Sequence, residues 1–466
     1  MSYNSITKQH IQQLEQIVGK KQIYLSEDKL EKYGQDRTEN LLFVPEVVVL
    51  PDNVRQISLI MRFCYENNIP VTTRGGGTGL AGGALPVCGG LLISMERFDK
   101  IIEIDECNLQ VTTEVAVITE ILQMAVREKG LYFPPDPASS GCCFIGGNIA
   151  TNAGGPRAVK YGVVKDYVLN LEVVLSNGDV IWTGANTLKN ATGYNLTQLM
   201  VGSEGTLGII TKAVLKLIPY PTHSLLMLVP FYSSYRAAEA VSAIFKGGIT
   251  PSCLEYIDRR AIDITLDYLQ DYSLQPDDKV QAHLILEVDG GHLEKLYHDC
   301  ERIQEVVEGY ECGEILFADD TPSKEKLWKI RNNISQAVKL YSDVKKADAV
   351  VPRGELPKLF KGIHHICSQF GVNCVSFGHA GDGNIHISLL KEKLSDEYWD
   401  KEIDSVIYAI FNLVKTLKGT ISGEHGIGFV KKKYMGIVFS EIELNLMRDI
   451  KKTFDPKGIL NPQKMF

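Results

Sequence analysis

The sequence lacks the features that would place the chain in a membrane, in an export route or on nucleic acid. None of its apolar runs reaches 18 residues, so no membrane-spanning helix is expected. The N-terminal stretch "MSYNSITKQHIQQLEQIVGKK" is polar and has no hydrophobic signal core. A net charge of −8 argues against a nucleic-acid partner, which usually requires a basic face. The rest of the composition, 44% hydrophobic and 23% charged over 466 residues, is typical of a globular protein with two or three domains.

The ten cysteines lack the spacing of a metal cluster. No two of them form a C-x-x-C pair, which argues against an iron–sulfur cluster or a structural zinc site built from local thiol pairs. Adjacent Cys142 and Cys143 lie in an apolar stretch and are expected to pack. Without a disulfide framework or an export signal, the chain is expected in the reducing cytoplasm, with any membrane association made through a partner.

Two α+β regions follow one another along the chain. In the first, "EVVVLP" (46–51) and "IPVTTRG" (69–75) are predicted strands on either side of a helix over 53–68, and this β-α-β order favours parallel pairing. The second region begins at 220 and alternates strands such as "HLILEVDG" with helices such as "EKLWKIRNNISQAVKLY". The final stretch, "SEIELNLMRDIKKTFDPKGILNP", is predicted to be a helix and loop that returns to the first region.

Six glycines fall within nine residues of "TTRGGGTGLAGGALP" (72–86). Gly77-x-Gly79-x-x-Gly82 satisfies the dinucleotide-binding pattern formally, but no helix is predicted after the loop, because the chain leads through Pro86 to another strand. Successive glycines still let backbone N–H groups converge on an anion and admit a phosphate close to the chain. We therefore expect a phosphate-cradling loop; the alternative is a flexible surface loop.

Two further stretches are rich in glycine. The first, "PPDPASSGCCFIGGNIATNAGGPRAVKYG" (134–162), carries small residues that suit a backbone packed against a flat ring system, with Asn and Thr side chains to hydrogen-bond it. A tight irregular connection explains that stretch equally well. The second, "VGSEGTLGIIT" (201–211), comes directly before a predicted strand.

The stretch "FGHAGDGNIHISLL" (377–390) predicts a hairpin that carries two histidines. Asp382-Gly383 is a strong signal for a two-residue type I′ turn. That turn would place His379 directly opposite His386, with Cβ atoms about 4.5–5.5 Å apart. The pair is interpreted either as metal ligands or as structural or solvent-facing histidines, with Asp382 as a turn former.

A third ligand is available in "ISGEHGIG" (421–428), where Glu424 precedes His425. Side chains of neighbouring residues in an extended backbone point to opposite faces, so one of the two would ligate and the other would serve another purpose. Two imidazoles and a carboxylate suit Zn²⁺, Mn²⁺ or Fe²⁺, with open positions for substrate oxygens. A metal-dependent hydrolase that activates water at this site is therefore one hypothesis.

Six motifs in order, covering nearly the whole chain, resemble one branch of the vanillyl-alcohol oxidase/p-cresol methylhydroxylase superfamily of flavoproteins. This branch contains D-lactate dehydrogenases, D-2-hydroxyglutarate dehydrogenases and the flavin subunit of glycolate oxidase. The motifs are "RGGGTGLAGG", "PPDPASSGCCFIGGNIATNAGG", "VGSEGTLGIIT", "FGHAGDGNIH", "SGEHGIG" and "FDPKGILNP".

The resemblance implies an α+β protein: a two-part FAD-binding domain of the p-cresol methylhydroxylase type and an α+β cap domain that carries an antiparallel sheet. The expected segments are a helical lead-in (1–40), the FAD-binding domain (41–219), the substrate or cap domain (220–425) and a C-terminal segment returning to the FAD domain (426–466). Within the superfamily, a non-redox flavin transferase is an alternative activity. A further hypothesis is a non-enzymatic nucleotide-binding or assembly subunit. It is disfavoured because candidate residues for a metal site, a catalytic base and substrate-binding cations are all present.

The same resemblance implies which residues contact FAD. The first loop would hold the pyrophosphate, and the second stretch would line the flavin or its ribityl chain. The implied contacts are Arg74, Gly75, Gly76, Gly77, Thr78, Gly79, Pro135, Asp136, Gly147, Asn148, Asn152, Gly154, Glu204, Ile210 and Asn461. Relatives that attach FAD covalently often place a histidine in the first loop, where this chain has Thr78. Non-covalent FAD is therefore expected.

The resemblance also implies a hydroxy-acid site. His379, His386 and Glu424 would hold a divalent ion, which lowers the pKa of the substrate hydroxyl as it does for bound water. His425 is the candidate base, because an imidazole titrates near neutrality; the alternative role is a hydrogen bond to Glu424.

Three further residues are implied to bind substrate: Arg331, Ser335 and Lys346. Arg331 and Lys346 match the positions that hold the substrate carboxylate, and Ser335 stands where a relative carries threonine.

The leading hypothesis is FAD-dependent oxidation of a D-2-hydroxy acid to the 2-oxo acid, with D-lactate or glycolate as the expected substrate. Electrons would leave the reduced flavin to an iron–sulfur subunit, an electron-transferring flavoprotein or a quinone. The motifs address only the carboxylate–hydroxyl head of the substrate, so its side chain stays open.

Overall fold

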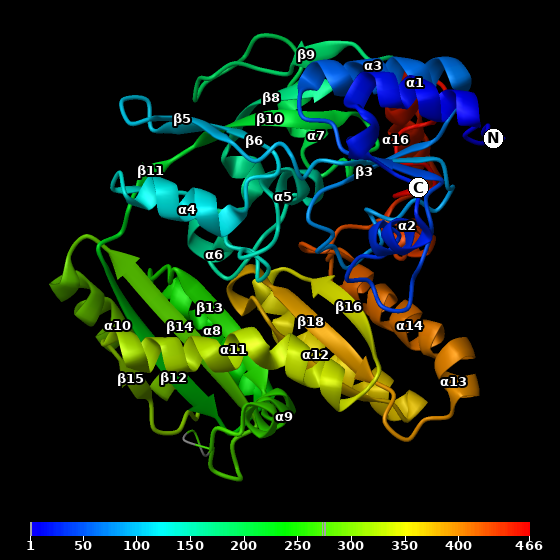
Figure 1. Cartoon of the computed structure of the whole chain (residues 1–466). Helices are drawn as coiled ribbons and strands as arrows, with labels where there is room; N and C mark the ends of the chain where they lie inside the picture. The colour runs from blue at the N-terminus through cyan, green and yellow to red at the C-terminus, as the bar shows by residue number, and fades with distance from the viewer. Residues whose placement is uncertain (1, 273, 275) are drawn as a thin grey trace. The chain divides into compact units, whose positions relative to one another are not determined.

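The chain divides into two compact units, which we call unit 1 and unit 2. The computed structural model describes residues 2–272, 274 and 276–466 (Figure 1). Unit 1 contains the residues up to Gly154, Val163–Tyr220 and Glu424–Phe466. Unit 2 contains Gly155–Gly162 and Pro221–Gly423. Both units combine helices with sheets that are mainly antiparallel, which confirms the predicted α+β class.

Unit 1 contains three sheets, with strand orders β1-β2-β4-β3, β5-β6-β10-β8-β9 and β11-β7. The strands are β1 (Ile23–Tyr24), β2 (Val47–Val49), β3 (Val71–Arg74), β4 (Leu91–Ser94), β5 (Ile101–Asp105), β6 (Gln110–Glu114), β7 (Leu131–Tyr132), β8 (Val168–Val174), β9 (Val180–Trp182), β10 (Ile209–Lys216) and β11 (Ile218–Pro219). β2 and β3 are both parallel to β4, which lies between them. The predicted β-α-β unit is thus present, but its two strands pair through β4 rather than with each other.

The helices of unit 1 cover these sheets with amphipathic faces. They are α1 (Lys8–Val18), α2 (Glu27–Tyr33), α3 (Val54–Asn67), α4 (Thr119–Arg127), α5 (Ile145–Thr151), α7 (Leu196–Met200), α15 (Met435–Val438) and α16 (Glu441–Phe454). In α3, the Asn53 side chain accepts the N–H of Gln56 as an N-cap, and Ile57, Ile60 and Cys64 are fully buried at helical spacing. Within the described part of the chain, no helix is both long and apolar enough to cross a membrane.

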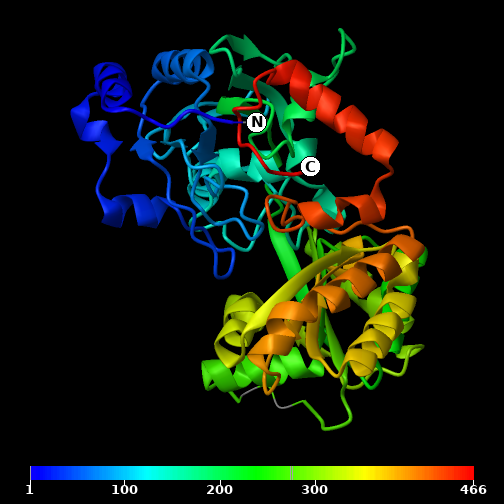
Figure 2. The ribbon, with the colours of Figure 1, turned by 90° about the vertical axis from the view of Figure 1, so that its right-hand side faces the viewer.

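The C-terminal segment belongs to unit 1 together with the N-terminus (Figures 1 and 2). Leu460 forms a parallel bridge with Val71 on β3, and the N–H of Asn461 donates to the Val71 carbonyl. This pairing brings residues near position 460 beside the glycine loop that follows β3.

Unit 2 is built on one seven-stranded antiparallel sheet with the order β15-β12-β14-β13-β17-β18-β16. Its strands are β12 (His223–Phe231), β13 (Cys253–Asp258), β14 (Ala282–Gly290), β15 (Leu316–Ala318), β16 (Val344–Val350), β17 (Asn373–Gly378) and β18 (Asn384–Leu390). Its helices are α6 (Ala158–Tyr161), α8 (Ser234–Lys246), α9 (Arg259–Leu269), α10 (Leu293–Glu308), α11 (Thr321–Tyr341), α12 (Leu356–Phe370), α13 (Asp396–Lys401) and α14 (Ile403–Thr416).

Both faces of this sheet are covered by helices. On one face, Ile257 of β13 and Ile285 of β14 pack with apolar side chains of α9 and α11. The neighbouring Tyr256 points to the other face and stacks on Phe360 of α12, with ring centroids 4.4 Å apart. Because successive strand residues alternate between faces, a polar residue at an odd position of β13, such as Glu255, is buried under α9 and α11.

Candidate functional site

The turn that joins β17 to β18 differs from the predicted one. His386 pairs with Phe377, two residues earlier than the predicted partner His379. The prediction of a two-residue turn at Asp382-Gly383 is therefore wrong. Residues Ala380–Asp382 form a 3₁₀ turn and Gly383 adopts a left-handed conformation, with φ of +78°. The connection is therefore longer than a type I′ turn, and His379 lies just beyond the end of its strand.

The two histidines nevertheless lie together. A register shift of two residues keeps each side chain on its original face of the sheet, whereas a shift of one would reverse it. The rings of His379 and His386 are 5.1 Å apart and nearly perpendicular. Each ring offers a nitrogen within 4.8 Å of one on the other, a separation that suits two ligands of one metal ion.

The turn depends on glycine at position 383. A Cβ there would overlap the carbonyl oxygen of Val351, and the positive φ disfavours any L side chain. We expect Gly383→Ala to lower the free energy of unfolding by about 2 kcal/mol or more in urea denaturation. Gly371→Ala is the matched control: φ is +63°, and no described atom lies within 4 Å of its added Cβ. It should lose only about 1 kcal/mol, and equal losses in the two variants would contradict the steric argument.

A buried carboxylate lies behind His379. Glu255 on β13 is fully buried, and its Oε1 lies 2.6 Å from Nδ1 of His379. Burial alone would raise the pKa of this carboxyl, but Arg331 and His379 outweigh it and lower the pKa to about 2. A carboxylate at Nδ1 fixes the orientation of a metal-ligating imidazole, so Nε2 is the nitrogen of His379 that would face an ion.

Of the three residues expected to bind substrate, only Arg331 is buried. It lies on α11, donates from Nε to Oε2 of Glu255 at 2.6 Å, and places its guanidinium 5.3 Å from the centroid of the Phe377 ring. Ser335, one helical turn further along α11, is exposed. Lys346 on β16 is half-buried, opposite Ser388 of β18. The structure thus gathers Arg331 with the histidines and leaves Ser335 at the surface of unit 2.

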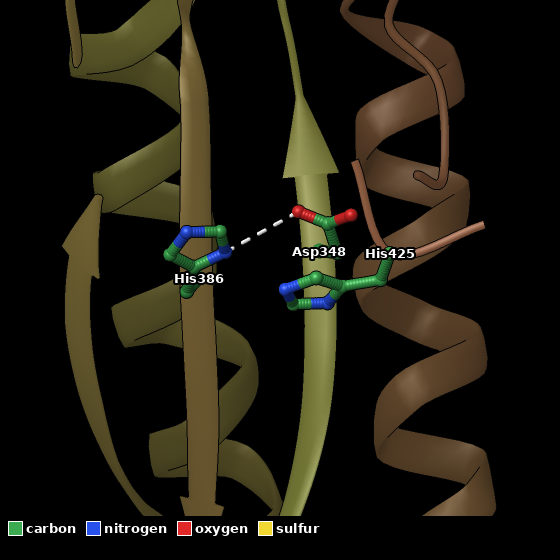
Figure 3. Close-up of side chains that lie close together, drawn as sticks. All are labelled: Asp348, His386 and His425. Carbon is green, nitrogen blue, oxygen red and sulfur yellow. Dashed lines mark ion pairs between the residues drawn. The ribbon is translucent and has the colours of Figure 1, made fainter. Parts of the chain in front are cut away.

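A second buried carboxylate lies behind His386. Asp348 on β16 is directly opposite His386 on β18, and its Oδ1 is 3.3 Å from Nδ1 of the imidazole (Figure 3). The same Oδ1 accepts the side-chain amide of Asn384 at 2.7 Å. Its Oδ2 accepts the hydroxyl of Ser422 at 3.1 Å and the N–H of Gly423 at 2.9 Å. Asp348 therefore ties one histidine to the segment that immediately precedes Glu424.

Glu424 and His425 belong to the C-terminal part of unit 1. The chain bends over 423–425 and Gly426 has φ of +76°, so the backbone is not extended there. The alternation expected for the Glu424 and His425 side chains therefore has no structural basis. Within unit 1, a Cβ added at Gly154 would lie 3.0 Å from Oε2 of Glu424, so only glycine fits there without displacing the carboxylate.

The glycine loop has the backbone freedom expected of an anion cradle. Gly77 and Gly82 have φ of +66° and +70°, and no helix follows the loop before β4, as predicted. A Cβ at Gly77 would overlap the guanidinium of Arg74, which folds back over the loop. Arg74 is partly buried, which lowers its pKa from the ordinary value. Thr78 is half-buried, while Gly76 and Gly79 are exposed.

The second glycine-rich stretch forms the short helix α5 and its flanks. Asn148 is buried and donates to the hydroxyl of Thr119 at 2.6 Å, and Asn152 ends the helix with φ of +50°. A Cβ at Gly147 would meet no described atom within 4 Å, so open space lies beside this position. Pro135 is buried and Asp136 half-buried in the connection before the helix.

The third stretch and the C-terminus meet at Glu204. Its carboxylate accepts the N–H groups of Ile427 at 2.7 Å and Gly428 at 2.8 Å, although burial raises its pKa. Asn461 donates its side-chain amide to the carbonyls of Gly83 and Glu204. Its buried Oδ1 has no hydrogen-bond partner among the described residues. Ile210 on β10 is half-buried against the apolar cores of unit 1.

These features of unit 1 fit a phosphate-bearing cofactor. The glycine loop provides N–H groups and close approach, Arg74 provides a cation, Gly147 faces open space, and the orphaned oxygen of Asn461 can accept a ligand donor. One contact to this loop was not predicted from the sequence. The hydroxyl of Thr38 accepts the N–H of Gly82 at 2.7 Å.

Two family models match the chain. One, described as "FAD linked oxidases, C-terminal domain", matches residues 220–465, and the other, described as "FAD binding domain", matches residues 45–184. These two matches together span most of both units.

Curated relatives match the chain over nearly its full length. The glycolate oxidase subunit GlcD of Bacillus subtilis is 37% identical and covers 99% of this chain and 97% of its own. The D-lactate dehydrogenase of Anaerostipes hadrus is 33% identical over 99% of this chain and 98% of its own. The D-2-hydroxyglutarate dehydrogenase of Stutzerimonas stutzeri is 31% identical over 98% of each.

Among solved structures, p-cresol methylhydroxylase with substrate bound is similar in fold. The TM-score is 0.78 at 19% sequence identity, covering 99% of this chain and 97% of that one. At this identity the likeness concerns the fold alone, and it confirms the predicted fold type.

Proposed function

The chain belongs to the family of FAD-linked oxidases, and we propose that it oxidises a D-2-hydroxy acid to the 2-oxo acid, with D-lactate or glycolate as the leading substrates. The main support is that full-length relatives at 31–37% identity are named for glycolate, D-lactate and D-2-hydroxyglutarate, which share one carboxylate–hydroxyl head. In unit 2, the buried Arg331 and the half-buried Lys346 carry positive charges that suit the carboxylate of that head.

FAD is proposed to bind non-covalently to unit 1. The glycine loop from Arg74 to Gly79 would hold the pyrophosphate, and the segment from Pro135 to Gly154 would line the flavin and its ribityl chain. Glu204 would hold the 427–428 backbone beside the cofactor through the two N–H groups it accepts, and Asn461 would offer its Oδ1.

A divalent ion is proposed at His379, His386 and Glu424, with Zn²⁺, Mn²⁺ or Fe²⁺ as the candidates. The donor set supports this. The His379 imidazole has a buried carboxylate 2.6 Å from Nδ1, the His386 imidazole has one 3.3 Å from Nδ1, and the glutamate follows Gly423, whose N–H donates to Asp348. When bound, FAD supplies a two-electron acceptor for the hydride from the substrate Cα, and the ion supplies Lewis acidity toward the substrate oxygens.

The chain's own residues would then orient the substrate and move one proton. Arg331 and Lys346 would hold the substrate carboxylate, and Ser335 would assist from the next turn of α11. His425 would take the hydroxyl proton at an imidazole nitrogen as the Cα–H leaves with its electron pair. A separate acceptor, an iron–sulfur subunit, an electron-transferring flavoprotein or a quinone, would reoxidise the flavin.

The test uses the purified full-length protein under anaerobic conditions. D-lactate, L-lactate, glycolate and D-2-hydroxyglutarate are each added, and loss of the oxidised-flavin absorbance is followed with and without prior chelation. We expect a yellow flavoprotein that is reduced by a D-2-hydroxy acid or glycolate, and not by L-lactate. Absence of bound flavin would overturn the proposal. Reduction that persists after verified removal of all metal would overturn only the metal-assisted step.

A further inference from the structure

One fully buried carboxylate in unit 2 holds two groups to which the proposed function gives different tasks. Oε1 of Glu255 lies 2.6 Å from Nδ1 of His379, and Oε2 is 2.6 Å from Nε and 2.5 Å from Nη2 of Arg331. We propose that Glu255 is a positioning residue that couples the metal ligand His379 to the substrate-binding Arg331. This inference rests on the proposed function. It adds a structural coupling between the proposed metal site and Arg331, the arginine proposed to bind the substrate carboxylate.

Glu255 is held rigidly enough to serve this role. β13 is the central strand of the seven-stranded sheet, and Glu255 is paired with Ile285 of β14 on one side. On the other side, β13 pairs with β17, the strand that leads into His379. Strand pairing on both sides therefore fixes the backbone from which the Glu255 carboxylate reaches His379 and Arg331.

Arg331 is equally constrained. It approaches from α11, with Nε and Nη2 both directed at Oε2 of Glu255, and its guanidinium lies over the Phe377 ring. The planar guanidinium fixes the direction of the carboxylate more closely than a lysine ammonium would. Because both Arg331 nitrogens hold Oε2, Oε1 is the oxygen that contacts the His379 imidazole, and a change at Arg331 would shift that contact.

The coupling predicts an effect of Arg331 on metal affinity in the absence of substrate. Substrate binding by Arg331 alone predicts no such effect. If Arg331 only held the substrate carboxylate, replacing it would leave metal affinity in the absence of substrate unchanged. If Glu255 transmits the position of Arg331 to His379, the same replacement weakens metal binding with no substrate present.

The first experiment measures Mn²⁺ and Zn²⁺ affinity of metal-depleted holoflavoprotein by calorimetry. Glu255→Gln is expected to weaken binding about tenfold or more, as loss of an outer carboxylate partner typically does. Glu287→Gln is the matched control: Glu287 is a buried acid on the adjacent strand β14, bonded to Arg157 and Trp328 instead of to a histidine. It should bind the metals as the wild type does.

The second experiment isolates the coupling and does not depend on the folding of Glu255→Gln. Arg331→Lys keeps a positive charge beside Glu255 but loses the paired contacts, and we expect substrate-free metal binding to weaken about threefold or more. Arg157→Lys, which alters the equivalent arginine beside Glu287, is the control and should leave affinity unchanged.

The outcomes separate the two levels of the proposal. Wild-type metal affinity in Arg331→Lys would overturn the coupling, as would a loss in Arg157→Lys of equal size. A wild-type protein that binds neither metal would instead overturn the metal site of the proposed function. Normal reduction by the hydroxy acid with unchanged affinity in both Glu255→Gln and Arg331→Lys would overturn this inference alone.

Discussion

His425→Ala is expected to lower the rate of flavin reduction by the hydroxy acid about 10²- to 10⁴-fold, the usual contribution of a general base. The substrate hydroxyl must lose its proton as the Cα–H leaves, and an imidazole is the side chain suited to accept a proton near neutrality. FAD content should not change, because none of the residues proposed to hold FAD is replaced. The rate is measured by anaerobic stopped-flow absorbance, and FAD content by the flavin spectrum of the purified variant.

A second histidine provides the control for this prediction. His365 lies exposed on α12, so His365→Ala should retain the wild-type rate. A His425→Ala variant that reduces its flavin within about threefold of the wild-type rate would instead support the alternative role, in which His425 only hydrogen-bonds Glu424. Loss of FAD from His425→Ala would show that the residue contacts the cofactor.

The family could be predicted from the sequence because it depends on local motifs and the order in which they occur. The family matches over 45–184 and 220–465 and the full-length relatives confirm that assignment. Helix α3 illustrates why such local predictions succeed. Ile57, Ile60 and Cys64 are buried at helical spacing, and Asn53 at its start is the residue that caps it.

The turn between β17 and β18 shows where local patterns fail. Asp-Gly is a hairpin signal in isolation, but here tertiary contacts decide the backbone. Gly383 lies against the Val351 carbonyl, and a Cβ added at Gly381 would come within 2.6 Å of the Val159 side chain. Both contacts come from segments distant in sequence, and they favour the longer 3₁₀ connection over the two-residue turn.

The buried carboxylates behind the histidines could not be placed from the sequence. Glu255 is 76 residues from Arg331 and 124 residues from His379, so no spacing rule relates them. The one local signal was an acid inside an otherwise apolar strand, "CLEYI", which indicates a buried charge that requires a partner. "ADAVV" gave the same signal for Asp348.

Asp348→Ala is expected to lower the free energy of unfolding of unit 2 by about 4 kcal/mol, because several buried donors would lose their acceptor at once. Those donors are the Asn384 amide, the Ser422 hydroxyl and the Gly423 N–H, in addition to the ion pair with His386. Urea denaturation of the holoprotein measures this loss. Asp343→Ala is the control, because that carboxylate precedes the same strand but is 66% exposed and pairs only loosely with Lys391; its loss should stay within about 0.5 kcal/mol.

The Asp348 anchor also predicts an effect on the reaction that stability alone would not produce. Under conditions where Asp348→Ala remains folded, residues 422–423 lose their attachment to β16, and the segment leading to Glu424 and His425 loses its fixed position. Flavin reduction should therefore slow by about 10²-fold, the cost of misplacing reacting groups by an ångström, while FAD content is retained. Asp348→Asn keeps one acceptor oxygen, so its rate of flavin reduction should lie between the rates of the wild type and Asp348→Ala. A folded Asp348→Ala protein with wild-type reduction would show that the 422–425 segment holds its position without this carboxylate.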